Sequence, residues 1–275
     1  MTYATILVNL EAGRSNTHLL EAANAVAERF QAGVIGSTAC MPIQILYGDG
    51  YVYGDIFEQD SKEIASEIAR AEAEFRDAMG KGPRVLEWRS AVVTTSLSDH
   101  LASEACRADL VLTDAAPEGP RNTARRIRAG DLIMQVGRPV MLIAPGPAPL
   151  RMDRVLVAWK DTREARRAAA DALPLLKRAS RVSLVEIADK DDLVAARSRL
   201  DDVAQWLGRH GVTADVHARP ASGDDATGLE AIADELEADV VVAGAYGHSR
   251  VREWALGGVT RTLLRNTARS SLVSH

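Results

Sequence analysis

The stretches ADLVLTDA at 108–115 and ADVVVAGA at 238–245 repeat one pattern 130 positions apart, and this repeat decides the fold. Each is a short apolar run that follows an amphipathic segment, LASEACR in the first case and AIADELE in the second. A second pair, TILVNLE at 5–11 and RVLVAWK at 154–160, lies near the start of each half. Self-similarity over about half of a chain indicates that one domain has been duplicated.

Short Val/Ile/Leu runs alternate with segments of helical spacing along both halves. In the second half the expected strands are 154–159, 181–188, 212–218, 238–244 and 270–274, and the expected helices are 162–179, 193–211 and 228–237. Nearly continuous apolar strands between amphipathic helices are typical of a parallel sheet covered on both faces. The sequence therefore predicts an α/β protein of two tandem doubly wound parallel-sheet domains, Rossmann-like in type. The proline-rich PGPAPL at 145–150 separates them, which gives domains at 1–146 and 151–275.

The composition is that of an ordinary globular protein, with 47% hydrophobic and 26% charged residues. A formal net charge of -5 provides no basic field for nucleic acid or an anionic membrane, and aromatic residues amount to only 4%. Cys40 and Cys106 have no spacing typical of zinc or of a disulfide framework. The N-terminal MTYATILVNL lacks the features of a secretory signal, and no apolar run reaches the ~20 residues of a membrane span. We therefore expect a cytoplasmic protein with no metal site of its own.

A glycine-rich segment follows the last long apolar strand. Gly244 lies at the expected carboxyl end of that strand, Gly247 three positions later, and Gly257 with Gly258 just before an amphipathic segment at 259–268. Doubly wound sheets bind ligands at the carboxyl ends of their strands, and a helix N-terminus offers unpaired N–H groups to an anion. The spacing predicts either contact with a phosphate or tight turns that only let the loop and the helix pack.

The segment ADVVVAGAYGHSRVREWALGGVTRTLLRNT at 238–267 resembles the nucleotide loop of the universal stress protein family. Gly244, Gly247 and Gly257 match the G-x2-G-x9-G pattern of that family, and the whole chain resembles its tandem form. The resemblance implies a fold of the adenine nucleotide alpha hydrolase type, a role in the stress response, and binding of ATP or a related adenine nucleotide, with Mg²⁺ as its companion. The residues that it implies at the nucleotide site are Ala158, Asp161, Gly244, Gly247, His248, Gly257, Gly258, Val259 and Thr260.

The second half departs from the family pattern in ways that bear on recognition. Gly258 stands where the family has Ser or Thr, which leaves Thr260 as a candidate hydroxyl. Lys160 stands where the family has an acidic residue that meets the adenine, and a lysine accepts no hydrogen bond from an amino group. Asp161 is a candidate for that role, while Lys160 is a candidate to reach a phosphate. For His248 the alternatives are contact with a phosphate and exposure in the loop.

The first half departs further at its counterpart of the glycine segment. Asp114 and Pro117 stand at the positions of Gly244 and Gly247. A proline cannot adopt left-handed geometry, and a carboxylate repels phosphate. We therefore expect no nucleotide site in the first half. The four arginines at 121–128 are expected on a solvated helix face, with an anion or partner site as the alternative.

The sequence contains no known catalytic motif. We therefore expect at most a slow hydrolysis of ATP, and no residue is assigned to that reaction. The leading hypothesis is a regulatory protein that binds adenine nucleotide through its second domain. One alternative is a nucleotide-free scaffold in which the fifth strands of the two halves pair and unknown protein partners dock. Another is a carrier of a small or lipid-like ligand that uses the Tyr-rich insertion at 41–57, which is otherwise expected as a lid, a subunit contact or local packing. The chain is expected as a monomer or a homodimer.

Overall fold

The computed structural model describes two compact units of the chain. The described residues are 2–43, 54–80, 82, 84–115, 124–146, 148–221, 225–246 and 268–275. Those of the N-terminal unit lie within Tyr3–Thr113 and Gly119–Arg138, and those of the C-terminal unit within Met1–Thr2, Asp114–Glu118 and Pro139–His275. The strand at 140–143 therefore counts with the C-terminal unit, although it follows the first half of the sequence.

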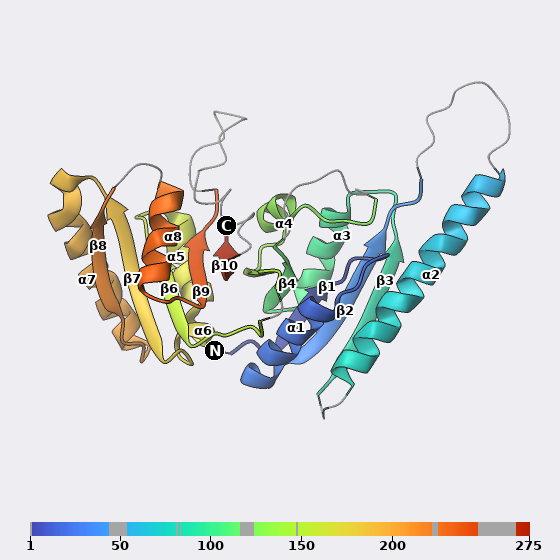
Figure 1. Cartoon of the computed structure of the whole chain (residues 1–275), viewed down its shortest axis with the longest axis horizontal. Helices are drawn as coiled ribbons and strands as arrows, with labels where there is room; N and C mark the ends of the chain where they lie inside the picture. Colours follow the sequence, from blue (N-terminus) through green and yellow to red (C-terminus); the bar gives the residue numbers. More distant parts are fainter. Residues whose placement is uncertain are drawn as a thin grey trace, which may run out of the picture. The chain divides into compact units, whose positions relative to one another are not determined.

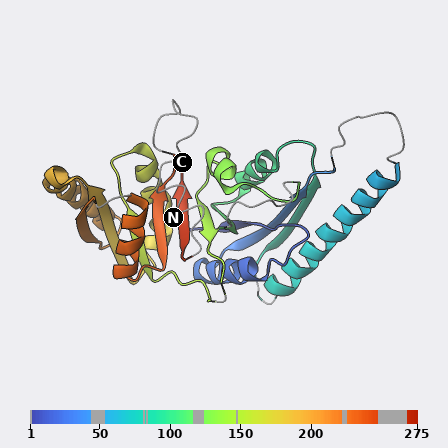
Figure 2. The same ribbon diagram turned by 45° about the horizontal axis from the view of Figure 1, so that its top comes forward.

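The N-terminal unit alternates strands and helices. Its elements are β1 (Thr5–Asn9), α1 (Thr17–Phe30), β2 (Gly33–Cys40), α2 (Gly54–Met79), β3 (Leu86–Val92), α3 (Leu97–Glu104), the short η1 (Ala105–Arg107), β4 (Leu110–Asp114) and α4 (Ala129–Gln135). The strands are parallel in the order β3-β2-β1-β4. Helices α1 and α2 lie on one face of this sheet, and α3 and α4 lie on the other (Figures 1 and 2).

The C-terminal unit repeats this alternation. Its elements are β5 (Val140–Ile143), β6 (Arg154–Ala158), α5 (Arg163–Asp171), α6 (Leu173–Leu176), β7 (Arg181–Ala188), the short η2 (Lys190–Asp192), α7 (Leu193–Arg209), β8 (Asp215–Pro220), α8 (Asp225–Glu235), β9 (Val240–Gly244) and β10 (Ser270–Ser274). The strand order is β5-β10-β9-β6-β7-β8. All of these neighbours are parallel except β5 and β10, which pair antiparallel. Helix α8 covers one face of the sheet, and α5 and α7 cover the other (Figure 1).

The predicted α/β class with mainly parallel sheets is confirmed, and three details differ from the prediction. The single helix expected at 162–179 is interrupted at Ala172, and Pro174 lies in the first turn of α6, where its missing N–H is tolerated. The third strand of this half begins at Asp215 rather than at Val212. The antiparallel β5–β10 pair, with Leu142 opposite Ser271, also departs from a purely parallel arrangement.

The central strands are buried along nearly their whole length. Val240, Val241 and Val242 in β9 expose none of their surface, and all five residues of β10 are buried. Strands covered on both faces need apolar side chains at successive positions, which explains the continuous apolar runs in the sequence. Among the described residues, no helix combines the length and the apolar character needed to cross a membrane.

One hydrogen-bonded anchor occurs in both units at equivalent positions. In the C-terminal unit, Oδ2 of Asp239 accepts hydrogen bonds from the backbone N–H groups of Asp153 and Arg154, at 2.9 and 2.8 Å. In the N-terminal unit, Oδ2 of Asp109 accepts from the N–H groups of Ala4 and Thr5, at 2.8 and 3.0 Å. Asp239 thus connects the start of β9 to the start of β6, and Asp109 connects the start of β4 to the start of β1. The duplication therefore extends from sequence pattern to individual hydrogen bonds.

We expect Asp239→Ala to lower the free energy of unfolding of the C-terminal unit by about 1–3 kcal/mol, because two backbone N–H groups lose their acceptor. Urea unfolding, followed separately for the two units by hydrogen exchange, measures the loss. Asp201→Ala is the matched control: it removes an exposed i,i+4 ion pair with Arg197 and should change stability by no more than about 0.5 kcal/mol. Equal losses in the two variants would contradict the anchoring role.

Candidate functional site

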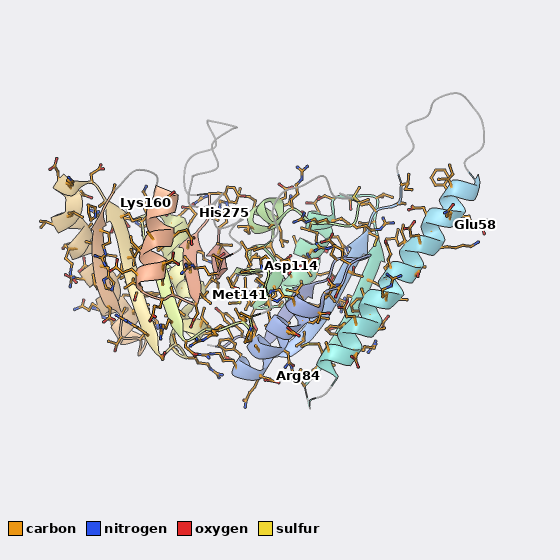
Figure 3. The ribbon with its side chains drawn as sticks, in the orientation of Figure 1. Glu58, Arg84, Asp114, Met141, Lys160 and His275 are labelled. Carbon is orange, nitrogen blue, oxygen red and sulfur yellow. The ribbon has the colours of Figure 1, made fainter. Side chains whose placement is uncertain are left out.

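A cavity of about 450 Å³ lies in the C-terminal unit where β6, β7 and β8 end. In parallel α/β sheets the ligand crevice lies outside these carboxyl ends. Figure 3 shows the side chain of Lys160 at this edge of the sheet, and that of His275 after the end of β10. The cavity is lined by Lys160, Asp161, Thr162, Glu186, Ile187, Ala188, Asp189, Asp192, Arg199 and Ala221.

One wall of the cavity is fixed by Arg199 of α7. Its guanidinium donates to the buried carboxylate of Glu186 at the end of β7, with 3.1 Å from Nε to Oε1, and to Oδ2 of Asp192 at 2.7 Å. Hydrogen bonds to Glu186 and then to Asp192 raise the pKa of Arg199 above its usual range. The guanidinium therefore stays charged and connects the strand, η2 and α7.

The segment that follows β6 forms another wall. Trp159 continues the strand pairing by donating its N–H to the carbonyl of Val185 at 2.7 Å. Thr162 caps α5, because its side-chain hydroxyl accepts a hydrogen bond from the N–H of Ala165 at 3.3 Å. Asp161 lines the cavity but forms an ion pair with Arg166.

Of the other residues that the sequence places at the site, Ala158 and Gly244 are described. Ala158 ends β6 and lies in register with Val185 of β7 and Ala243 of β9. The remaining ones, Gly247, His248, Gly257, Gly258, Val259 and Thr260, lie outside the described residues. Their assignment to the nucleotide site stays a prediction, as do the proposed roles of most of the Tyr-rich insertion.

Packing within the C-terminal unit requires a glycine at position 244. A Cβ at this position would lie 2.5 Å from the backbone N of Ala165 and 2.5 Å from the carbonyl carbon of Glu164. The first turn of α5 therefore crosses the end of β9 in direct contact with its backbone. Only glycine permits this approach, so the packing alternative for this glycine is supported whether or not a ligand also contacts it.

The same contact buries an acidic side chain that the sequence interpretation missed. Glu164 exposes 4% of its surface beside Gly244. Burial opposes ionisation, but the hydrogen bond from Arg163 and further bonds at the start of α5 outweigh it and lower the pKa of this carboxyl. The ion pair with Arg163 keeps a negative charge at the beginning of the helix, where the helix dipole favours it. The alanine-rich pattern of this helix gave no signal for a buried acid.

The equivalent region of the N-terminal unit is organised around Arg125. This residue is 7% exposed, so the expectation of a solvated helix face for 121–128 is wrong at this position. Its guanidinium donates to Oε2 of Glu67 at 2.6 Å, to the carbonyl of Met41 at 2.7 Å and to Oδ1 of Asp60 at 3.3 Å. Asp60 and Glu67 lie on α2, and Met41 follows β2. An isolated guanidinium would be too costly to bury, so these acceptors explain its position.

Two neighbours show how tightly this region is packed. Burial raises the pKa of the Cys40 thiol to about 11, although the positive charge of Arg125 opposes the rise. Gly13 adopts φ +79°, and a Cβ there would lie 2.6 Å from Oε1 of Glu67. The side chains of the unit itself thus occupy the space around the end of β2. The absence of a nucleotide site in the first half stays a prediction.

Comparisons with known proteins bear on the fold of the chain. Residues 152–275 match the model of the universal stress protein family. A universal stress protein from Archaeoglobus fulgidus has a similar structure, with a TM-score of 0.72, 12% identity and coverage of 98% of each chain. A putative universal stress protein from Pseudomonas aeruginosa aligns with a TM-score of 0.64 and 15% identity, over 99% of this chain and 93% of the other. No curated protein matches the sequence.

We expect Gly244→Ala to destabilise the C-terminal unit by about 1–3 kcal/mol, because the added methyl group overlaps the backbone of α5. Gly208→Ala is the matched control, since Gly208 lies in α7 with open space around its Cβ position. There the helix propensity of alanine should raise stability by up to about 1 kcal/mol. Thermal unfolding of the two variants gives the comparison, and a stable Gly244→Ala protein would show that the close contact is not required.

We expect Arg125→Met to lower the stability of the N-terminal unit by about 3–5 kcal/mol, because it leaves the buried carboxylate of Asp60 and the half-buried carboxylate of Glu67 without their cation. Arg107→Met removes an exposed ion pair with Glu104 and should cost less than about 1 kcal/mol. Urea unfolding with a probe in α2 measures both. If the two variants lose the same stability, Arg125 does not hold this region together.

Proposed function

We propose that the C-terminal unit binds ATP or a related adenine nucleotide in the cavity at the ends of β6, β7 and β8, because residues 152–275 match the model of the universal stress protein family. The observation that carries this proposal is the cavity itself. It lies where a parallel sheet offers a ligand crevice, and its volume of about 450 Å³ is in the range of pockets that hold small molecules.

The chemistry of the lining supports a polar ligand of this kind. Lys160 offers a cation, the hydroxyl of Thr162 can donate or accept, and the carboxylate of Asp189 accepts hydrogen bonds. These groups suit the hydrogen-bonding edge of a base and the hydroxyls of a ribose. The glycines predicted to hold phosphate follow β9, which is the neighbour of β6 in the sheet.

We further propose that the protein acts as a regulatory nucleotide-binding protein in the stress response rather than as a catalyst. The domain limits 1–146 and 151–275, the cytoplasmic location, the companion Mg²⁺ and a monomeric or homodimeric state remain predictions from the sequence. The antiparallel pairing of β5 with β10 favours the second candidate, a scaffold in which these strands form a platform for protein partners.

Titration of the full chain with ATP by calorimetry tests the proposal. We expect saturable binding at one site per chain, and stabilisation of the C-terminal unit by about 2.7 kcal/mol when free ATP reaches 100 times its dissociation constant. Ala221→Trp should weaken binding because the indole occupies the cavity, and so should the pair Gly247→Val and Gly257→Val.

Val194→Trp is the control for Ala221→Trp, because Val194 is 85% exposed on α7 and does not line the cavity. It should bind ATP as the unaltered protein does. Absence of ATP binding, or equal affinities in all of these variants, would reject nucleotide binding at this cavity and leave the scaffold as the better account.

A further inference from the structure

The charged groups that line the cavity are not equally available to a ligand. Arg199 is engaged by Glu186 and Asp192, and Asp161 is engaged by Arg166. Lys160 and Asp189 remain, and within the described part of the chain neither side chain has a hydrogen bond or an ion pair. Among the described residues that line it, the cavity therefore presents one uncommitted cation and one uncommitted carboxylate.

The sheet places these two residues at the same cavity. Lys160 follows β6 and Asp189 follows β7, and these two strands are paired, with Ala158 in register with Val185. Both residues line the cavity. A donor and an acceptor are thus presented to one cavity at the carboxyl edge of the sheet.

The backbone around Asp189 is fixed by its own contacts. The N–H of Asp192 donates to the carbonyl of Asp189 at 2.9 Å, which closes η2. Arg199 holds the side chain of Asp192 at 2.7 Å and also binds Glu186, three residues before Asp189. Because the chain is tied on both sides of Asp189, the position of this residue does not depend on a ligand.

We propose that Asp189 and Lys160 together read the base of the nucleotide: Asp189 accepts a hydrogen bond from the 6-amino group of adenine, and Lys160 donates to the adjacent ring nitrogen N1. This inference rests on the proposed function. The Watson–Crick edge of adenine carries a donor next to an acceptor, and a carboxylate and an ammonium group in one cavity offer the complementary pair of groups. The pair supplies the acceptor that Lys160 alone cannot provide, and Asp161 is not needed for it.

Binding of ATP is compared with that of purine riboside triphosphate, which lacks the 6-amino group, and of 1-deaza-ATP, which lacks N1. A hydrogen bond to a charged group corresponds to roughly 10- to 100-fold in affinity. The unaltered protein should therefore prefer ATP over each analogue by about this factor. Asp189→Asn should reduce the preference over purine riboside triphosphate, and Lys160→Met the preference over 1-deaza-ATP.

Asp191→Asn is the matched control, because Asp191 carries the same charge in the same turn and does not line the cavity. It should keep both preferences. If ATP does not bind, the proposed function fails and this inference fails with it. If ATP binds but the protein does not distinguish it from purine riboside triphosphate, or if Asp189→Asn keeps the distinction, only the base-reading role is rejected. Tighter binding of the 6-oxo analogue ITP than of ATP would also reject it.

Discussion

In-register parallel pairing brings the carboxyl ends of β6, β7 and β9 to one edge of the C-terminal sheet, and the rest of the site depends on this constraint. Ala158 lies level with Val185 on one side and with Ala243 on the other. The segments that leave these strands must therefore begin next to one another. α5 starts five residues after β6 ends and crosses the end of β9, and it can do so only where Gly244 lacks a side chain. The cavity forms on the opposite side of β6, toward β7.

The two units share an architecture, and each has an arginine that binds two carboxylates but in a different setting. Arg125 satisfies its guanidinium with two carboxylates and a backbone carbonyl, and so fills the region around the end of β2. Arg199 is held at the wall of a cavity by Glu186 and Asp192 and leaves the cavity open. In one unit the guanidinium connects α2 with the residue that follows β2. In the other it shapes a space that a ligand can enter.

Sequence periodicity was sufficient for the fold, because the strands that are covered on both faces need continuous apolar runs, and β7, β9 and β10 appear where those runs occur. The structure also explains why both halves carry an aspartate at the equivalent positions 109 and 239, since each accepts hydrogen bonds from two backbone N–H groups. The site was harder to derive. Arg125 is buried because it pairs with Glu67 and Asp60, which lie 58 and 65 positions away in the sequence. A local sequence pattern does not predict a pairing over such a separation. A glycine required by packing and a glycine that approaches a ligand look identical in sequence, which is why Gly244 remained ambiguous until its contact with α5 was known.

The most direct test of the central claim, that the nucleotide occupies the C-terminal cavity, is photo-crosslinking of the full chain with 2-azido-ATP, followed by mass spectrometry of the labelled peptides. The account predicts that labels fall on peptides containing residues 158–162 or 186–192 and that excess ATP prevents labelling. Protected labels on peptides around Gly13, Met41 or Arg125 would place the nucleotide in the N-terminal unit and contradict the account.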